Sequence, residues 1–278
     1  MKTIGEMQDG TDRLRRKGRT IAFVPTMGYL HEGHLSLIRE GEKHGDHVVL
    51  SIFVNPTQFG PEEDLDAYPR SIENDLALAE KEGVDTVFLP NEKDLYPERY
   101  ETYVSQETLP NHLCGLNRPI HFRGVATVVT KLFNIVKPHV AVFGQKDYQQ
   151  LLVIKQMVRD LNFGIEIIGA PTLRESDGLA MSSRNANLPA HLRPSARSLS
   201  QSMHHAQDLL HRGETDAHVI IQETSDYISS HPETDIDYVS LCDPNTLVDV
   251  DSILPQTLMA LAVKVGGVRL IDSMILTQ

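Results

Sequence analysis

The stretch that most constrains this chain is PTMGYLHEGH, at residues 25–34. It follows an apolar run at 20–24 (TIAFV) that is typical of a buried parallel strand. It precedes residues 35–42, whose apolar and charged positions face opposite sides of a helix. A strand, a glycine-containing loop and a helix in this order leave backbone N–H groups at a helix start, where the helix dipole also favours an anion. We therefore expect this stretch to bind the phosphates of a nucleotide.

Two histidines, His31 and His34, add what a plain phosphate loop lacks. Their imidazole N–H groups can donate to a phosphoryl oxygen as negative charge builds on it. Zinc binding and a purely structural role are the alternatives. The histidines are not the i,i+4 pair of a metalloprotease helix, and no third ligand is close in sequence, so we favour the phosphate role.

Further apolar runs predict an α/β fold. Strands are expected at 47–54, 86–89, 139–143 and 166–169, and helices near 71–83, 125–136 and 148–161. Near-continuous apolar strands that alternate with helices are typical of a Rossmann-like parallel sheet covered on both faces. Residues 90–119 show no pattern that can be assigned.

The pattern changes near residues 173–176. Helices at 195–211 and 216–229 are followed by strands at 236–241, 258–265 and 268–276, and Gly266-Gly267 predicts a hairpin between the last two strands. We therefore expect a Rossmann-like nucleotide-binding domain at residues 1–174 and a smaller α+β domain at residues 175–278, which would act as a lid.

Polar residues follow several of the predicted strands, at the sheet edge where open α/β proteins bind ligands. Gln58 follows the second strand, and its amide can donate and accept for a substrate with a hydroxyl and a carboxylate. Lys146 follows the fourth strand as a positive charge for phosphates, beside Asp147 and one turn before Gln150. The alternative for Gln58 is a turn residue that faces water, and the alternative for Lys146 is a surface lysine beside an N-cap aspartate, Asp147.

Other candidate residues lie outside these loops. Ser182, Ser183 and Arg184 offer two hydroxyls and a guanidinium to triphosphate oxygens, although a hydrophilic loop would look the same. Asp75 could approach Mg²⁺ or be an exposed helix carboxylate. The pair Val128-Val129 could line an apolar pocket or pack in the core.

The net charge of −12 argues against nucleic acid or an anionic membrane as a partner. Cys114 and Cys242 lie far apart, which predicts neither a zinc site nor a disulfide framework. No run approaches the ~20 apolar residues of a membrane span, and no signal-peptide pattern occurs at the N-terminus. We expect a cytoplasmic protein.

Six motifs together give the chain a family resemblance. VPTMGYLHEGH, SIFVNPTQFG, DLDAYPR, HFRGVATVV, FGQKDYQQ and DGLAMSSRN resemble those of the pantothenate synthetases, or pantoate–β-alanine ligases, in order and spacing over essentially the whole chain. That family is related to the class I aminoacyl-tRNA synthetases. HEGH is similar to their HIGH signature, and MSSR stands where they have KMSKS.

The resemblance implies the ATP-dependent condensation of (R)-pantoate with β-alanine through a pantoyl adenylate, with release of pyrophosphate and AMP. It also implies ATP as a substrate, Mg²⁺ and a homodimer. The implied catalytic residues are His31, His34, Lys146, Ser182 and Arg184. The implied ATP-binding residues are Met27, Gly28, Tyr29, Leu30, His31, Glu32, Gly33, His34, Gly144, Gln145, Lys146, Asp147, Leu173, Met181, Ser182, Ser183 and Arg184.

For pantoate, the resemblance implies Gln58 and Gln150, with the gem-dimethyl group against Met27, Phe53, Val128, Val129 and Phe143. Leu173 stands where the family more often has valine, a change that a main-chain contact to ATP would tolerate. The family assigns His34 as a proton donor, but pantoate is already ionised, so a hydrogen-bonding role fits equally. A related nucleotidyltransferase and a non-catalytic nucleotide-binding regulator are the rival interpretations.

Overall fold

The computed structural model describes residues 1–61 and 63–278, which form two compact units. The first comprises Met1–Glu107, Arg118–Gln145 and Gln150–Pro171, and the second comprises Thr108–Asn117, Lys146–Gln149 and Thr172–Gln278. The two short segments join the second unit because they contact residues much later in the chain. The expected domains at residues 1–174 and 175–278, with the second acting as a lid, stay a prediction.

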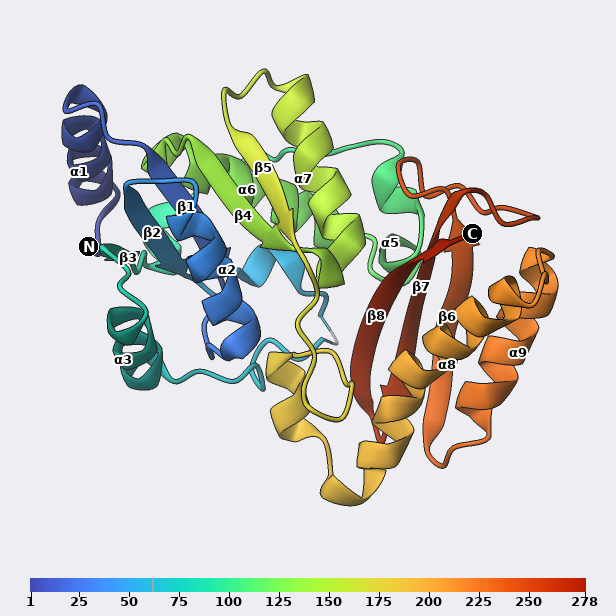
Figure 1. Cartoon of the computed structure of the whole chain (residues 1–278). Coiled ribbons are helices and arrows are strands. Elements are labelled where there is room, and N and C mark those ends of the chain that lie inside the picture. Colours follow the sequence, from blue (N-terminus) through green and yellow to red (C-terminus); the bar gives the residue numbers. More distant parts are fainter. Residues whose placement is uncertain (62) are drawn as a thin grey trace. The chain divides into compact units, whose positions relative to one another are not determined.

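The first unit contains a five-stranded parallel sheet, which confirms the Rossmann-like fold (Figure 1). Its strands are β1 (Ile21–Thr26), β2 (His47–Ile52), β3 (Thr86–Phe88), β4 (Val140–Gly144) and β5 (Glu166–Ala170), in the order β3-β2-β1-β4-β5. The order reverses direction between β1 and β4. In open α/β sheets, ligands bind beyond the carboxyl ends of the strands at such a switch point.

Helices cover both faces of this sheet. Helices α2 (Glu32–Glu42) and α3 (Ile72–Lys81) share an apolar cluster with Val24 and Val142 on one face. Helix α6 (His121–Val136) covers the other face, where Phe133 makes edge-to-face contacts with Phe23 and Phe143. Since alternate residues of β1 and β4 serve opposite faces, both strands are apolar throughout, as the sequence indicated.

Three further helices and two 3-10 turns of the described residues lie wholly or partly in the first unit. They are α1 (Ile4–Arg16), α4 (Glu92–Leu95) and α7 (Tyr148–Asp160), with 3-10 turns η1 (Pro56–Gln58) and η3 (Gln145–Asp147). The first two residues of α7 and the last two of η3 belong to the second unit.

Three details differ from the sequence predictions. The strand predicted to end at Pro25 continues to Thr26, because β4 pairs with β1 only at Ala22 and Phe23 and no strand requires an N–H from Pro25. Ser71 occupies the N-cap of α3 but makes no capping hydrogen bond there. Helix α1 was not predicted, although Thr3 and Glu6 form a capping box at its start.

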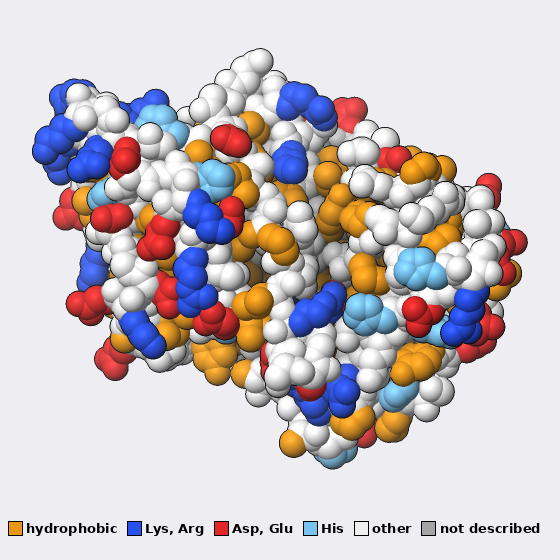
Figure 2. Space-filling view, viewed as in Figure 1, with side chains coloured by type: hydrophobic (Ala, Val, Ile, Leu, Met, Phe, Trp, Pro, Cys, Tyr) orange, Lys and Arg blue, Asp and Glu red, His pale blue; other side chains and the backbone are white. Residues whose placement is uncertain are grey.

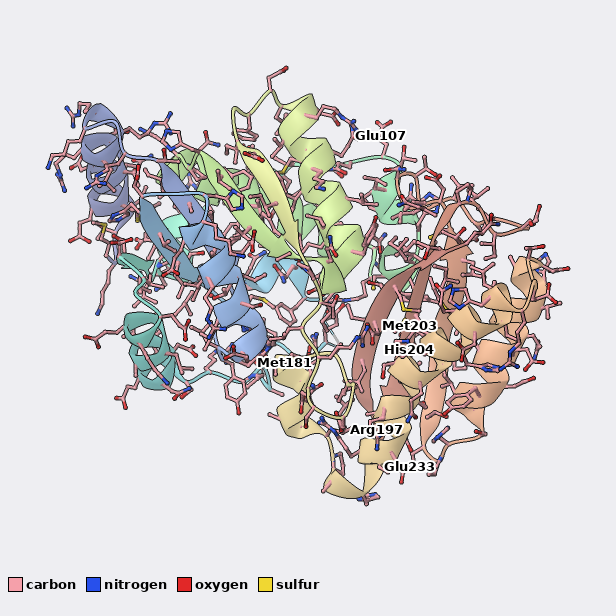
Figure 3. All side chains as sticks on the ribbon, viewed as in Figure 1. Glu107, Met181, Arg197, Met203, His204 and Glu233 are labelled. Carbon is pink, nitrogen blue, oxygen red and sulfur yellow. The ribbon has the colours of Figure 1, made fainter. Side chains whose placement is uncertain are left out.

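The second unit is an antiparallel three-stranded sheet with two long helices on one face (Figure 1). Its strands are β6 (Thr234–Cys242), β7 (Gln256–Val265) and β8 (Val268–Thr277), and its helices are α5 (Cys114–Asn117), α8 (Arg193–His211) and α9 (Ala217–Ser229). The predicted hairpin is confirmed, with positive φ angles of 55° and 83° at Gly266 and Gly267. Met203, which Figure 3 labels on α8, is buried in the core of this unit.

The surface shows mixed charge. On the face in Figure 2, acidic and basic side chains intermingle, and basic side chains gather over α1, whose last turn carries Arg13, Arg15 and Arg16. Within the described ranges, no helix is both long and apolar enough to cross a membrane.

Candidate active site

The loop between β1 and α2 is held by hydrogen bonds to its backbone. Thr26 Oγ1 donates to the Ser51 carbonyl at 2.9 Å and accepts from the Gly28 N–H at 3.2 Å. Gly28 has a φ of +83°, and a Cβ atom there would lie 2.9 Å from Asp75 Oδ2. Position 28 therefore favours glycine, because its backbone is left-handed and lies close to a carboxylate.

Asp75 fixes the centre of this loop from α3. Its side chain is only 1% exposed, and its two oxygens accept the Tyr29 N–H at 2.8 Å and the Leu30 N–H at 2.7 Å. Tyr29 has a positive φ of 51°, which these bonds help to hold. The magnesium role of Asp75 stays a prediction; the observed contacts are to the protein backbone.

The side chains of His31 and His34 cap backbone N–H groups at the start of α2. Nδ1 of His31 accepts from the Gly33 N–H at 3.1 Å, and Nδ1 of His34 accepts from the His31 N–H at 3.3 Å. The two rings lie 4.1 Å apart between centroids. A neutral imidazole that accepts at Nδ1 carries its proton at Nε2. Both rings therefore supply Nε2–H donors at the N-terminus of a helix, which suits an anion.

Gln58 lies in η1 at the end of β2, against α6. It is 7% exposed, and its Nε2 lies 3.2 Å from Sδ of Met27 in the β1–α2 loop. Gly124 permits the close packing, because a Cβ atom there would lie 2.6 Å from the Gln58 Cα. The structure thus places Gln58 next to Met27 of the β1–α2 loop, which leads to His31.

The predicted apolar contacts for pantoate are buried residues of the same unit. Phe53, Val128, Val129 and Phe143 are each less than 9% exposed. Among the residues after β4, Gln145 donates to the Gly169 carbonyl at 3.1 Å, and Gln150 is half-buried on α7. Their roles toward a ligand stay predictions.

The other predicted ATP residues belong to the second unit: Lys146, Asp147, Leu173, Met181, Ser182, Ser183 and Arg184. Figure 3 labels Met181 at the start of the MSSR segment. Ser182 caps the following 3-10 turn η4 (Ser183–Asn187) by accepting the Arg184 N–H at 3.3 Å. The Met181 N–H donates to the Leu173 carbonyl at 3.0 Å, which ties the two predicted ATP segments together.

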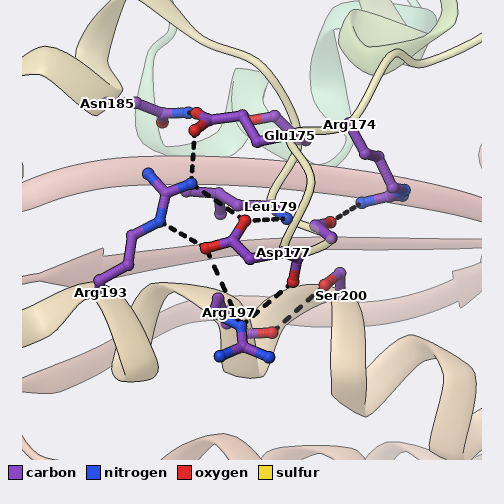
Figure 4. A network of polar contacts seen from close by, with 10 residues as sticks. Arg174, Glu175, Asp177, Leu179, Asn185, Arg193, Arg197 and Ser200 are labelled. Carbon is purple, nitrogen blue, oxygen red and sulfur yellow. Dashed lines mark hydrogen bonds and ion pairs between the residues drawn. The ribbon is translucent and has the colours of Figure 1, made fainter.

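A network of ion pairs holds this segment in place (Figure 4). Arg193 on α8 forms a bidentate pair with Asp177, at 2.8 and 3.0 Å, and reaches Glu175 at 2.5 Å. Glu175 in turn accepts from Asn185 at 2.7 Å. The Arg193 hydrogen bond lowers the pKa of Asp177 to about 2. The pair therefore stays ionised at any physiological pH, and it anchors both sides of the MSSR segment.

Some supporting residues were not predicted from the sequence. Asn55 and Tyr96 form hydrogen bonds around Gln58, and Arg193 organises the network just described. Asn55 is part of the NPTQFG motif, which was the available signal. Tyr96 and Arg193 carry no comparable signal, since their partners lie 41 and 16 residues away in the chain.

A parallel sheet with a helix N-terminus, a glycine loop and imidazole donors beyond its first strand defines a nucleotide-binding α/β protein. Comparison with known proteins identifies the particular family: residues 1–275 match the family model described as pantoate-beta-alanine ligase. The chain belongs to this family.

Relatives cover nearly the whole chain. The pantothenate synthetase of Desulfatibacillum aliphaticivorans is 60% identical over 96% of this chain and 95% of its own length. The crystal structure of the Thermus thermophilus pantothenate synthetase superposes with a TM-score of 0.95 at 40% identity, covering 100% of this chain and 99% of that one. The Francisella tularensis pantoate-beta-alanine ligase, complexed with "Beta-gamma ATP and Beta-alanine", has a TM-score of 0.84 at 34% identity over 99% and 96% of the two chains.

Proposed function

We propose that this chain condenses (R)-pantoate with β-alanine to pantothenate through a pantoyl adenylate, with ATP as the activating substrate. The observation that carries the proposal is the 3.2 Å contact between Gln58 and Met27, since it joins an amide suited to pantoate to the loop suited to phosphates. The Francisella tularensis relative, complexed with "Beta-gamma ATP and Beta-alanine", supports ATP and β-alanine as substrates of this chain.

Activation is required because a carboxylate does not react with an amine at neutral pH. An oxygen of the pantoate carboxylate attacks the α-phosphorus of ATP, and the bond from that phosphorus to pyrophosphate breaks. The unprotonated β-alanine amine then attacks the acyl carbon, the C–O bond breaks, AMP leaves with that oxygen, and the nitrogen releases a proton to solvent. No covalent enzyme nucleophile is needed, so catalysis is largely positioning and stabilisation of negative charge.

The Nε2–H groups of His31 and His34 are the proposed donors to the phosphates as charge builds in the transition state. Because the attacking carboxylate is ionised, His34 needs only to donate a hydrogen bond in this step. Lys146, Ser182 and Arg184 are proposed to act on the ATP phosphates as well, with Leu173 near the adenine. Gln58 and Gln150 are proposed to bind pantoate.

We propose that Mg²⁺ arrives with ATP. Among the residues that the structure describes, no group of three or more His, Cys, Asp or Glu side chains forms a metal site. Both oxygens of Asp75 accept backbone N–H groups, so we propose that its main role is to hold the loop. Magnesium commonly keeps several waters and is bound largely through substrate phosphates, so a dedicated protein site is not required.

A homodimer, a cytoplasmic location and small molecules as the sole partners complete the proposal. The family resemblance supports the dimer, and light scattering of the purified protein would measure its mass. Cys114 and Cys242 are both free thiols, as is usual in a reducing compartment.

The proposal is tested by measuring pyrophosphate release with ATP and pantoate in the absence of β-alanine. The unmodified protein should release about one equivalent in a burst, and His34→Ala and Lys146→Ala should each slow it roughly 10- to 1,000-fold. A cytidylyl- or adenylyltransferase of phosphorylated substrates, or a non-catalytic regulator, would release none. Bursts of normal rate in both variants would contradict the assigned roles.

A further inference from the structure

The orientation of the Gln58 amide can be deduced from one backbone group. Asn55 is 1% exposed, and its Nδ2 lies 3.1 Å from the carbonyl oxygen of Gly124 in α6. A carbonyl oxygen only accepts hydrogen bonds, so the Asn55 group that faces it must be the NH₂. The position of a backbone carbonyl therefore determines which way round the Asn55 amide lies.

The orientation of the Asn55 amide determines that of the Gln58 amide. The same Nδ2 of Asn55 lies 3.0 Å from Oε1 of Gln58, so the Gln58 oxygen faces inward and is occupied as an acceptor. The NH₂ of Gln58 then lies at the other side, 3.2 Å from Sδ of Met27. A thioether is a weak acceptor, so this NH₂ can exchange it for a stronger one.

Tyr96 completes the arrangement from the other side of Asn55. Its hydroxyl donates to Asn55 Oδ1 at 2.8 Å, and the Thr57 hydroxyl donates to the same oxygen at 3.0 Å. Both hydrogens and both acceptor sites of the buried Asn55 amide are thus used. A flipped Asn55 amide would place its oxygen against the Gly124 carbonyl and leave both hydroxyls facing an NH₂.

We propose that Tyr96 is a positioning residue that acts through Asn55 to hold Gln58 with only its NH₂ toward the substrate. The subsite therefore binds a hydrogen-bond acceptor of pantoate, a carboxylate or hydroxyl oxygen lone pair, and does not accept a hydrogen from it. This inference rests on the proposed role of Gln58 in binding pantoate. It narrows the sequence expectation that the amide both donates and accepts.

The surroundings of Tyr96 and Gln58 support a fixed geometry. Burial raises the pKa of Tyr96 to about 12, so its hydroxyl keeps its proton throughout the range of an enzyme assay. The Tyr96 ring packs edge-on against Tyr100, with centroids 5.0 Å apart. The Gln58 backbone carbonyl lies 2.9 Å from Nδ1 of His121 on α6, which holds the residue independently of its amide.

The positioning role is tested by Tyr96→Phe, with Tyr100→Phe as the matched control, because each keeps the ring and removes one hydroxyl. Steady-state kinetics should give a KM for pantoate roughly 3- to 10-fold higher in Tyr96→Phe, with the KM for ATP within about twofold of wild type. Tyr100→Phe should change neither constant. Thermal melting of both variants shows whether each is folded; a pantoate KM at the wild-type value in folded Tyr96→Phe would overturn the role.

The orientation of the amide is tested separately by Gln58→Glu against Gln58→Ala. In Gln58→Glu, one carboxylate oxygen still accepts from Asn55. The other oxygen replaces the NH₂ group and places a negatively charged acceptor toward pantoate. The KM for pantoate should therefore be about tenfold or more higher in Gln58→Glu than in Gln58→Ala. Tighter pantoate binding by Gln58→Glu than by Gln58→Ala would overturn the orientation.

These variants also separate the inference from the proposed function. A wild-type pantoate KM in Gln58→Ala, with pyrophosphate release intact, would refute the assignment of Gln58 and the inference with it, but not the reaction. A raised KM in Gln58→Ala together with an unchanged one in Tyr96→Phe would refute only the positioning role. An unmodified protein that releases no pyrophosphate from ATP and pantoate would refute the reaction itself.

Discussion

Replacement of Asp75 by alanine should both destabilise the protein and impair adenylation. The carboxylate is buried and accepts two backbone N–H groups, from Tyr29 and Leu30, at 2.8 and 2.7 Å. A hydrogen bond to a charged group contributes about 1.5–3 kcal/mol, and partial relaxation of the loop offsets part of the loss of two. We expect the free energy of unfolding to fall by about 3 kcal/mol. Adenylation should fall about 100-fold, because misplacement of reacting groups by about 1 Å has effects of this size.

The matched control for Asp75→Ala is Glu73→Ala. Both residues are acids in the first turn of α3, but Glu73 is exposed. An exposed substitution of this kind should change stability by less than about 0.5 kcal/mol. Urea unfolding measures the free energy of each variant, and pyrophosphate release without β-alanine measures adenylation.

The same pair of variants separates a structural carboxylate from a metal ligand. If Asp75 bound Mg²⁺, a raised Mg²⁺ concentration would restore adenylation in Asp75→Ala, and stability would be nearly normal. If Asp75 holds the loop, extra Mg²⁺ restores neither property. Wild-type stability combined with wild-type adenylation in Asp75→Ala would refute the reasoning entirely.

Three further predictions concern other groups. His34→Gln keeps an N–H near the position of Nε2, whereas His34→Asn keeps only an acceptor near the position of Nδ1. Pyrophosphate release should therefore be about tenfold faster in His34→Gln than in His34→Asn. Equal rates in the two variants would contradict the donor role of His34. Arg193→Lys loses the bidentate pair with Asp177, so the KM for ATP should rise several-fold while the KM for pantoate stays constant. His139 accepts the Ile21 N–H at Nδ1, and burial lowers the pKa of His139. In the unfolded chain His139 has its ordinary pKa of ~6.5, so it binds a proton at a higher pH than it does in the folded protein. Acidification below ~6.5 therefore favours the unfolded chain, and stability is lost. His139→Asn should reduce that loss in thermal melts between about pH 7.5 and 5.

The parallel sheet was predictable because its strands are apolar on both faces, which leaves an uninterrupted signal in the sequence. The end of β1 was not, since whether a strand tolerates Pro25 depends on which neighbour pairs there. The segment Thr108–Asn117 could not be assigned to the second unit, because Cys114 meets Tyr238 only through a contact across 124 residues.

The candidate site was likewise predictable from the sequence only in part. Motifs indicated His31, His34 and Gln58, but residue types alone do not reveal hydrogen-bond direction. Whether the histidines donate at Nε2 depends on the N–H groups that their Nδ1 atoms accept. Whether Gln58 donates depends on the orientation of the Asn55 amide, which is set by the Gly124 carbonyl 69 residues later in the chain. Asp75 accepts two backbone N–H groups of the loop that contains both histidines, and its role as a metal ligand stays a prediction.

The most direct test of carboxylate activation follows an oxygen isotope. Pantoate labelled with ¹⁸O in both carboxylate oxygens is converted with ATP and β-alanine, and the products are analysed by mass spectrometry. An adenylate route leaves one labelled oxygen in AMP and one in the amide carbonyl of pantothenate. Label in inorganic phosphate, with ADP as the nucleotide product, would mean attack on the γ-phosphorus and would contradict the account.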